Sequence, residues 1–473
     1  MNNNRQISFI KSSRGNDLLV CDGYIFNKEK ARSGFTYWRC VKYQSEDCLC
    51  RCTTNGGELI SQKKEHRHGP DPNQVNARRV LNQVKENART SQLSTQQIVA
   101  SNVIGINQST ASALPALPSM TRLVQRTRRD ANTPLPSPNS LSSLALPIEY
   151  TLSHRGEQFL QYDSGPDENR MLIFSTNNNL ELLRSSDCWY CDGTFKTAPS
   201  LFSQLYTVHC KINNTVIPTV YGLLPTKSES IYTSFFTAIS NLKPGLSPAT
   251  IMLDFEISSH NALRRVFPQT ILKGCFYHLS QSFWRKIQMN APTLSRYRED
   301  GDFVITAKMI LAICFVPIPD ICFAFEQLLF SDFFVNDAEI LNCLSDYFED
   351  FYIGRILRLN TRRPPLFPHS LWNCYDATIN NNGRTNNSVE GWHNGFARFI
   401  NCHHPDIFKF LEFLKSSQNL NEVKITQLQS GMVVSVERNR YKDHNQRLAN
   451  ICNTYRRENI VGYLRNIAYN ITI

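Results

Sequence analysis

The sequence predicts a multidomain protein with a small β-rich module, an α/β domain after it, and mainly helical regions toward the end of the chain. Three observations lead to this expectation. The chain has 473 residues, too many for one compact core, which suggests about two or three domains. Hydrophobic residues make up 41% and charged residues 19%, which indicates folded cores rather than overall disorder. Strand-like runs come first, then strands alternate with helical patterns, and finally strand patterns cease.

The β-rich module is predicted at residues 1–72. Short aromatic and branched runs, separated by Gly, Asn, Asp and Ser, predict strands at residues 24–26, 35–38 and 58–61. Residues 73–146 are expected to connect this module to the rest of the chain. They begin as a polar helix, and the part at 105–146, rich in Pro and Ser, predicts a flexible linker.

From residue 147 onward, strand and helix patterns alternate. Strands are expected at 170–174, 187–192, 202–210, 216–224, 249–255 and 270–276. Helices are expected at 230–242, near 260–267 and at 278–289. Strands in tandem, followed by strands that alternate with helices, predict a sheet with antiparallel and parallel portions over 147–290. Residues 291–385 predict a mainly helical insertion, and residues 401–473 predict a helical, basic C-terminal region.

Positive charge gathers toward the two ends of the chain, whose formal net charge is +11. By segment, the charge is +10 for 1–146, −4 for 147–390 and +5 for 391–473. Basic surfaces neutralise phosphates, which favours nucleic acid as a partner, although a merely solvated surface has the same composition. A basic run within the linker could act as a nuclear import signal or contact phosphate; it comprises Arg126, Arg128 and Arg129.

Two cysteines and two histidines in the first module could hold a metal ion. Cys40 and Cys48 are followed by the closely spaced pair His66 and His68. Thiolates and imidazoles suit tetrahedral zinc, and residues two apart in an extended segment share a face. A small module gains much from a structural ion. The alternative is two core cysteines with two surface histidines. The chain has 15 cysteines and starts without a signal-peptide pattern, so we expect reduced thiols or ligands rather than disulfides.

The motifs SSRGNDLLVCDGYIFN, FTYWRC, DCLCR and HRH occur in this order between residues 12 and 68. This order resembles the FLYWCH zinc-finger family. The resemblance implies a zinc-dependent fold that binds DNA or protein, and its structural Zn²⁺ ligands would be Cys40, Cys48, His66 and His68. A cysteine stands at position 50, where the family usually has alanine. Cys50 and Cys52 could therefore compete with Cys48 as ligands.

Three carboxylates stand out by their positions. Asp192 follows a strand in CDGTFK, Asp254 ends the apolar run IMLDFE, and Glu390 lies at a helix start in TNNSVEGWHNGF. A carboxylate at the end of a buried strand is costly unless it is paired or bound to a metal. Such a trio could hold two Mg²⁺ ions for phosphodiester chemistry. Each also has a local explanation, as a turn residue (Asp192) or as part of a helix cap (Asp254 and Glu390).

The motifs DGTFK, MLDFE, GCFYHLSQSFWRKI and TNNSVEGWHNGF follow one another between residues 187 and 400. This order resembles the transposase domain of Mutator-like elements. The resemblance implies a ribonuclease-H-like core over 147–290 and 386–400, interrupted by the helical insertion at 291–385. It also implies a DDE-type catalytic site with Mg²⁺ or Mn²⁺ held by Asp192, Asp254 and Glu390. FLYWCH modules accompany such domains, so the two resemblances support each other.

Two further pairs of residues within these motifs have open roles. Cys275 and His278 match the family's Cys-x-x-His motif and could bind metal or position DNA, or else pack at a strand–helix junction. Cys188 and Cys191 are interpreted as strand residues, because strand alternation places them on opposite faces. Direct contact of Trp392 and His393 with DNA is a further hypothesis.

Together these observations predict a DNA-binding transposase, or a host protein derived from one, that cleaves phosphodiester bonds and joins a 3′ hydroxyl to target DNA. The expected partner is double-stranded DNA, the expected location is the nucleus, and a paired-end assembly would make the protein a homo-oligomer. No apolar run is long enough to predict a membrane helix. The alternatives are a zinc-dependent DNA-binding regulator or interaction protein without catalysis, and an uncoupled nuclease.

Overall fold

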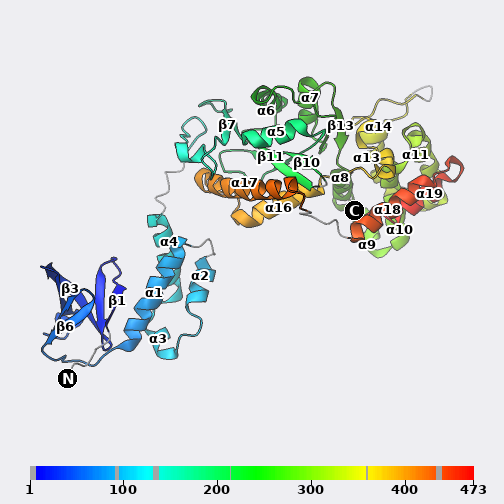
Figure 1. Cartoon of the computed structure of the whole chain (residues 1–473). Helices are drawn as coiled ribbons and strands as arrows, with labels where there is room; N and C mark the ends of the chain where they lie inside the picture. Colours follow the sequence, from blue (N-terminus) through cyan, green and yellow to red (C-terminus); the bar gives the residue numbers. More distant parts are fainter. Residues whose placement is uncertain are drawn as a thin grey trace. The chain divides into compact units, whose positions relative to one another are not determined.

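A computed structural model describes residues 7–90, 95–131, 138–213, 215–357, 361–432 and 439–472. The chain forms two compact units, Met1–Leu135 and Pro136–Ile473 (Figure 1). Each unit has its own hydrophobic core. Among the described residues, no helix combines the length and apolar character needed to cross a membrane. The two units are described separately below.

The first unit begins with a six-stranded antiparallel sheet in which each strand pairs with the next along the chain. Its strands are β1 (Ile7–Lys11), β2 (Asp17–Cys21), β3 (Tyr24–Arg32), β4 (Phe35–Cys40), β5 (Arg51–Asn55) and β6 (Glu58–Lys63). Gly23 and Gly34 adopt the positive φ angles that the tight turns between β2, β3 and β4 require. The buried side chains of Phe26 and Trp38 lie in the core of this module. The predicted β-rich module is therefore confirmed.

Four helices complete the first unit: α1 (Pro72–Thr90), α2 (Thr95–Asn102), α3 (Gln108–Ala113) and α4 (Leu117–Ala131). The prediction of a flexible linker at 105–146 is wrong where α3 and α4 lie. Met120 and Val124 of α4 pack against Val84 of α1 in a shared apolar core. Pro118 is tolerated because it lies in the first turn of α4, where backbone N–H groups lack helical partners.

The second unit is built on a seven-stranded mixed sheet with the order β13-β12-β9-β10-β11-β8-β7. Its strands are β7 (Leu160–Asp163), β8 (Leu172–Phe174), β9 (Cys188–Thr194), β10 (Gln204–Ile212), β11 (Thr215–Leu224), β12 (Thr250–Leu253) and β13 (Ile271–Gly274). Strands β7 to β11 pair antiparallel, whereas β12 is parallel to both β9 and β13. The predicted combination of antiparallel and parallel portions is confirmed.

Helices cover both faces of this sheet (Figure 1). One face packs on α5 (Asn177–Ser185), α6 (Glu229–Leu242) and α7 (Ile257–Val266). The other face is covered by α16 (Asn387–Ile400) and α17 (Ile407–Gln429): Val389 packs with Tyr190 and Met252, and Ile425 packs with Ile217. The sheet is thus buried on both sides, as its near-continuous apolar strands require.

The predicted insertion packs into a helical core that is separate from the core of the sheet. It contains α8 (Phe276–Met289), α9 (Ala291–Glu299), α10 (Gly301–Ala312), α11 (Ile321–Leu329), α12 (Asp332–Val335), α13 (Ala338–Phe348), α14 (His369–Trp372), α15 (Tyr375–Ile379), α18 (Asn439–Asn453) and α19 (Ile460–Ala468). Residues from α18 and α19, including Leu448 and Leu464, pack in the same cluster as Phe325 of the insertion. In the C-terminal region, α17 therefore packs on the sheet, whereas α18 and α19 belong to the helical core.

A buried hydrogen-bond network fixes α17 to the sheet. The side-chain oxygen of Gln418 accepts hydrogen bonds from the amide of Asn179 (3.0 Å) and the hydroxyl of Tyr221 (3.1 Å). The amide of Asn421 donates to the same hydroxyl at 2.9 Å. Gln418 is fully buried. These groups are shielded from water. If the side-chain oxygen of Gln418 were removed, water could not take its place as the acceptor for Asn179 and Tyr221.

We predict that Gln418→Leu lowers the free energy of unfolding by about 2–3 kcal/mol, because two buried donors lose their acceptor. Urea unfolding of the full chain measures the change. The matched control is Gln427→Leu, the same substitution at an exposed position of α17, which should change stability by less than about 0.5 kcal/mol. Equal effects of the two changes would contradict a structural role for this network.

Candidate metal centres

The first unit brings the four predicted zinc ligands together. Cys40 ends β4, Cys48 lies in the loop before β5, and His66 and His68 follow β6. One ligand atom from each lies within 4.8 Å of all the others. The Cys40 sulfur is 3.2 Å from Nε2 of His68, and the Cys48 sulfur is 3.4 Å from Nδ1 of His66. Two sulfurs and two imidazole nitrogens at this spacing fit a tetrahedral zinc ion.

Neighbouring groups orient the two imidazoles. Nδ1 of His68 lies 2.9 Å from the carbonyl oxygen of Gly69, which leaves Nε2 directed at the cysteines. Tyr24 stacks on the ring of His66, with ring centroids 3.6 Å apart. Burial raises the pKa of the Cys40 thiol to about 11, so deprotonation of this sulfur needs a compensating cation. The donor set and its surroundings therefore suit a structural zinc ion.

The possible competitors Cys50 and Cys52 lie outside this four-residue group. Both are buried in the module's core. The Cys50 sulfur accepts a hydrogen bond from the side-chain amide of Gln62 at 3.3 Å. Cys52 lies on β5, where it pairs with Trp38 of β4. The geometry thus favours Cys48 over its two neighbours as a ligand.

The second unit places the acidic residues at one edge of its mixed sheet. In the parallel pair β9 and β12, Tyr190 lies opposite Met252. Asp192 and Asp254 each come two residues later, Asp192 within β9 and Asp254 directly after β12, so both lie toward the same end of adjacent strands. Glu390 lies in the first turn of α16, which covers this face of the sheet. Two strand ends and one helix start therefore converge.

The tightest cluster consists of Asp192, Glu390 and His278. Nε2 of His278 is 3.4 Å from a carboxylate oxygen of Glu390 and 4.0 Å from one of Asp192. One atom from each of the three residues lies within 4.8 Å of the others, and Asp254 is outside that group. The electrostatic link to Asp254 is nevertheless clear: burial raises the pKa of its carboxyl group, and the charge of Asp192 raises it further.

The pKa of Glu390 is strongly perturbed. Burial raises its pKa to about 7, and the charge of Asp192 contributes in the same direction. Its carboxylate oxygen Oε1 is buried, lies 3.4 Å from Nε2 of His278, and forms no hydrogen bond within the described part of the chain. Burying two neighbouring carboxylates in this way is unfavourable unless a cation or proton is shared between them. This buried oxygen and the neighbouring carboxylate of Asp192 fit a divalent cation such as Mg²⁺ or Mn²⁺.

Models of two known protein families match segments of the chain. The model of the FLYWCH zinc finger domain matches residues 9–68, and the model of the MULE transposase domain matches residues 188–282. The chain carries a FLYWCH domain and a MULE domain. The latter match contains Asp192, Asp254, Cys275 and His278 and ends before Glu390. The two matches support a transposase-like or DNA-binding function.

Curated relatives match this chain over a short region. The mouse protein "FLYWCH-type zinc finger-containing protein 1" is 31% identical over 75 residues, which are 16% of this chain and 11% of that protein. The human protein with the same name is 27% identical over 88 residues, 19% of this chain and 12% of that protein. The chain thus spans about a tenth of the length of these relatives. Both relatives are named for FLYWCH-type zinc fingers.

Of the Cys-x-x-His pair in the MULE domain, only His278 reaches the acids. Cys275 is fully buried, and its sulfur accepts a hydrogen bond from the backbone N–H of Asn386 at 3.1 Å. The side-chain amide of Asn386 in turn donates to the carbonyl oxygen of Cys191 at 3.0 Å. Cys275 therefore holds the start of α16 at the junction of β13 and α8, and Asn386 attaches the same helix start to β9. This is the packing role that the sequence left open.

The sequence did not single out His393 as a partner of the acids. Its Nδ1 lies 3.4 Å from a carboxylate oxygen of Asp192, and its Nε2 lies 2.9 Å from the hydroxyl of Thr207. His393 is about as buried as Asp192, and direct contact of His393 with DNA stays a prediction. One signal was available: His393 follows Glu390 by three positions in a helix, so both side chains lie on one face.

For the FLYWCH domain, we predict that Cys40→Ala or His68→Ala removes the bound zinc and unfolds residues 1–72. Each change leaves only three ligands in a module whose core is small. Zinc per chain, measured by atomic absorption, and proteolysis of the first unit report the effect. The control is Cys50→Ala, which removes a buried thiol outside the cluster and should leave zinc content unchanged. A folded, protease-resistant first unit without zinc would refute the assignment.

Proposed function

We propose that this chain is a DDE-type DNA transposase, or a domesticated derivative of one, which cleaves phosphodiester bonds and transfers the freed 3′ end to target DNA. The observation on which this rests is the cluster of Asp192, Glu390 and His278 at one end of the mixed sheet, with Asp254 directly after the adjacent strand β12. The partner would be double-stranded DNA, recognised in part by the FLYWCH domain. Location in the nucleus and assembly into a homo-oligomer belong to the same proposal.

The sheet supports a ribonuclease-H-like core. On one side of β9, β10 pairs antiparallel with β9 and β11 pairs antiparallel with β10. On the other side, β12 pairs parallel with β9 and β13 pairs parallel with β12. Ligand sites of open α/β sheets lie at the carboxyl ends of parallel strands, and Asp192 near the end of β9 and Asp254 directly after β12 lie at that end of the sheet. The helical insertion enters between the second and third acids, because it occupies residues between Asp254 and Glu390.

In this proposal Asp192, Asp254 and Glu390 hold Mg²⁺ or Mn²⁺, with His278 as an additional ligand or a hydrogen-bond partner. When bound, paired cations activate the attacking oxygen and stabilise the leaving oxygen. The protein's own groups prepare the acids for this role. The backbone N–H of Gly193 donates to one oxygen of Asp192 at 2.9 Å, and His393 lies at the other oxygen. The carboxylate is thereby oriented from two sides before any substrate arrives.

A non-catalytic DNA-binding regulator is the second candidate. Two observations favour it: the curated relatives match only a short region of the chain, and Asp254 stands apart from the tight cluster. In that case the MULE domain would serve as a scaffold for the FLYWCH domain. An uncoupled nuclease would use the same acids but would not join DNA ends.

Cleavage and binding assays separate these candidates. We expect the full chain to nick duplex DNA that carries the inverted repeats flanking its own gene, with Mg²⁺ or Mn²⁺ present. Asp254→Asn should reduce the cleavage rate by at least about 1,000-fold. The reason is that the metal ions, which act on the reacting oxygens, would lose a negatively charged ligand. DNA binding should remain.

The control for this test is Asp187→Asn, which removes an exposed carboxylate just before β9. It should cleave at the rate of the unaltered protein. Cleavage without strand joining would indicate the nuclease. Retained DNA binding with no cleavage in either metal would refute the transposase proposal in favour of the regulator.

A further inference from the structure

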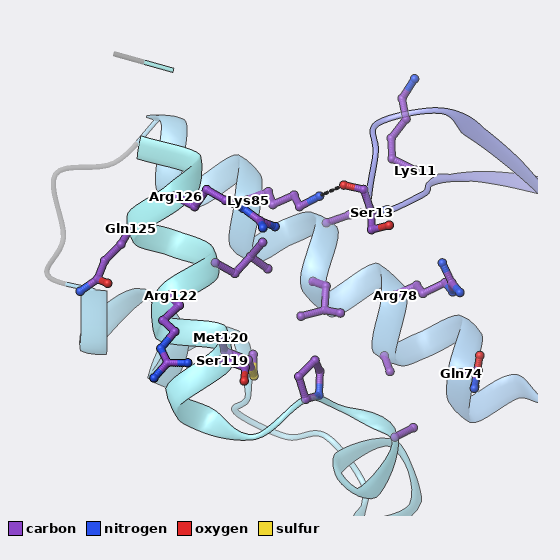
Figure 2. Close-up of a pocket in the computed structure, with 16 residues that line it drawn as sticks. Lys11, Ser13, Gln74, Arg78, Lys85, Ser119, Met120, Arg122, Gln125 and Arg126 are labelled. Carbon is purple, nitrogen blue, oxygen red and sulfur yellow. Dashed lines mark hydrogen bonds between the residues drawn. The ribbon is translucent and has the colours of Figure 1, made fainter. Parts of the chain in front are cut away.

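A groove in the first unit is lined by basic side chains, and most of its lining residues lie outside the FLYWCH match. It has a volume of about 690 Å³ and is formed by α1, α4, the segment before α4, and the end of β1 (Figure 2). Its cations are Lys11, Arg78, Lys85, Arg122 and Arg126. None of its lining residues is acidic. The groove therefore concentrates positive charge on a small surface.

Helical spacing explains why these side chains share one groove. Arg78 and Lys85 are seven positions apart on α1, and Arg122 and Arg126 are four apart on α4, so each pair lies on one helical face. The floor between them is apolar and includes Leu81 and Met120. Figure 2 shows the basic side chains of both helices around this floor.

Partners within the protein satisfy only part of this charge. Lys11 pairs with Asp17 at 2.6 Å, and Lys85 donates to the backbone oxygen of Ser13 at 2.9 Å. Among the described residues, Arg78, Arg122 and Arg126 form no ion pair with a carboxylate. Burial lowers the pKa of Lys85, and the charge of Arg126 lowers it further, so the cations repel one another. A bound anion would relieve that repulsion.

We propose that this groove binds the phosphate backbone of duplex DNA, as a second contact surface beside the FLYWCH domain. The inference rests on the DNA-binding part of the proposed function. It assigns a role to α1 and α4, which neither family match includes. Helices α1 and α4 thus bind the phosphates of the DNA, which positions the duplex without reading its sequence.

Chemistry and dimensions favour a DNA backbone over an acidic peptide. Guanidinium groups present paired donors that match phosphate oxygens, and three of the five cations are arginines. Gln74, Asn82 and Gln125 also line the groove and supply the amide donors common at phosphate contacts. Seven helical positions rise about 10 Å, which matches the rise of about three nucleotides along one strand. Residues 1–146 also carry a net charge of +10, which would attract a polyanion.

The test is the salt dependence of DNA binding by the full chain, measured by fluorescence anisotropy without divalent metal, so that cleavage does not contribute. The probe is a labelled duplex of about 30 base pairs of mixed sequence, a length that exceeds one helical turn several-fold. The variant carries Arg78→Gln, Arg122→Gln and Arg126→Gln together. We expect the slope of log K against log salt to fall in magnitude by roughly 2–3 and the affinity at about 0.1 M salt to fall on the order of 100-fold.

Two matched variants make the outcome decisive. Arg264→Gln, Arg298→Gln and Arg456→Gln together remove the same charge from exposed positions of the second unit, and should leave the slope within about one of the original. The triple exchange of the three groove arginines for lysine keeps the charge and should retain most of the slope. Zinc content and thermal unfolding verify that every variant is folded.

The possible failures are distinguishable. If the unaltered chain binds no duplex at all, both the DNA-binding function and this groove assignment fall. If it binds duplex but the groove variant matches the charge control, the groove assignment alone falls. If polyglutamate of equal charge occupies the groove and duplex DNA does not displace it, the occupant is an acidic protein segment and the proposal is overturned.

Discussion

The candidate site of the second unit depends on how the start of α16 is held against β9. Two hydrogen bonds provide this attachment: the Asn386 backbone donates to the Cys275 sulfur, and the Asn386 side chain donates to the Cys191 carbonyl oxygen. All three residues are fully buried, so water cannot compete for these donors and acceptors. Without this attachment, Glu390 would not be presented to Asp192. Cys275, which resembles a metal ligand in the sequence, thus accepts a hydrogen bond that holds the start of α16 in place.

The same constraint explains the electrostatics of the cluster. A helix start pressed onto a sheet brings Glu390 close to Asp192 with little water between them, and this closeness raises the pKa of Glu390 to about 7. His278 and His393 flank Asp192 on different sides and come from α8 and α16. Three separate elements therefore contribute to a site whose acidic groups repel one another. Such a surplus of negative charge is typical of sites built for cations.

Local patterns predicted most of the fold, because strands and helices of the second unit leave strong periodic signals. The run ATIMLDF predicted β12 and FSQLYTVHC predicted β10, and both strands lie where expected. The helices α3 and α4 were missed, because prolines and serines obscured a short apolar stripe that only becomes a core when α1 packs on it. Asp192, Glu390 and His278 were recognisable from motifs. The role of His393 was not, since its contact with Asp192 forms only when α16 meets the sheet.

The path of the C-terminal residues has a consequence for how the molecule is made. Helix α17 closes one face of the sheet, and α18 and α19 complete the helical core begun by the insertion. Helices α17 to α19 are therefore needed to bury surfaces that precede them by more than a hundred residues, as in the contact of Tyr463 with Phe315. Because these helices are translated after the surfaces that they cover, the second unit completes its cores late in synthesis. The six-stranded module of the first unit pairs each strand with the next along the chain, so it can fold earlier.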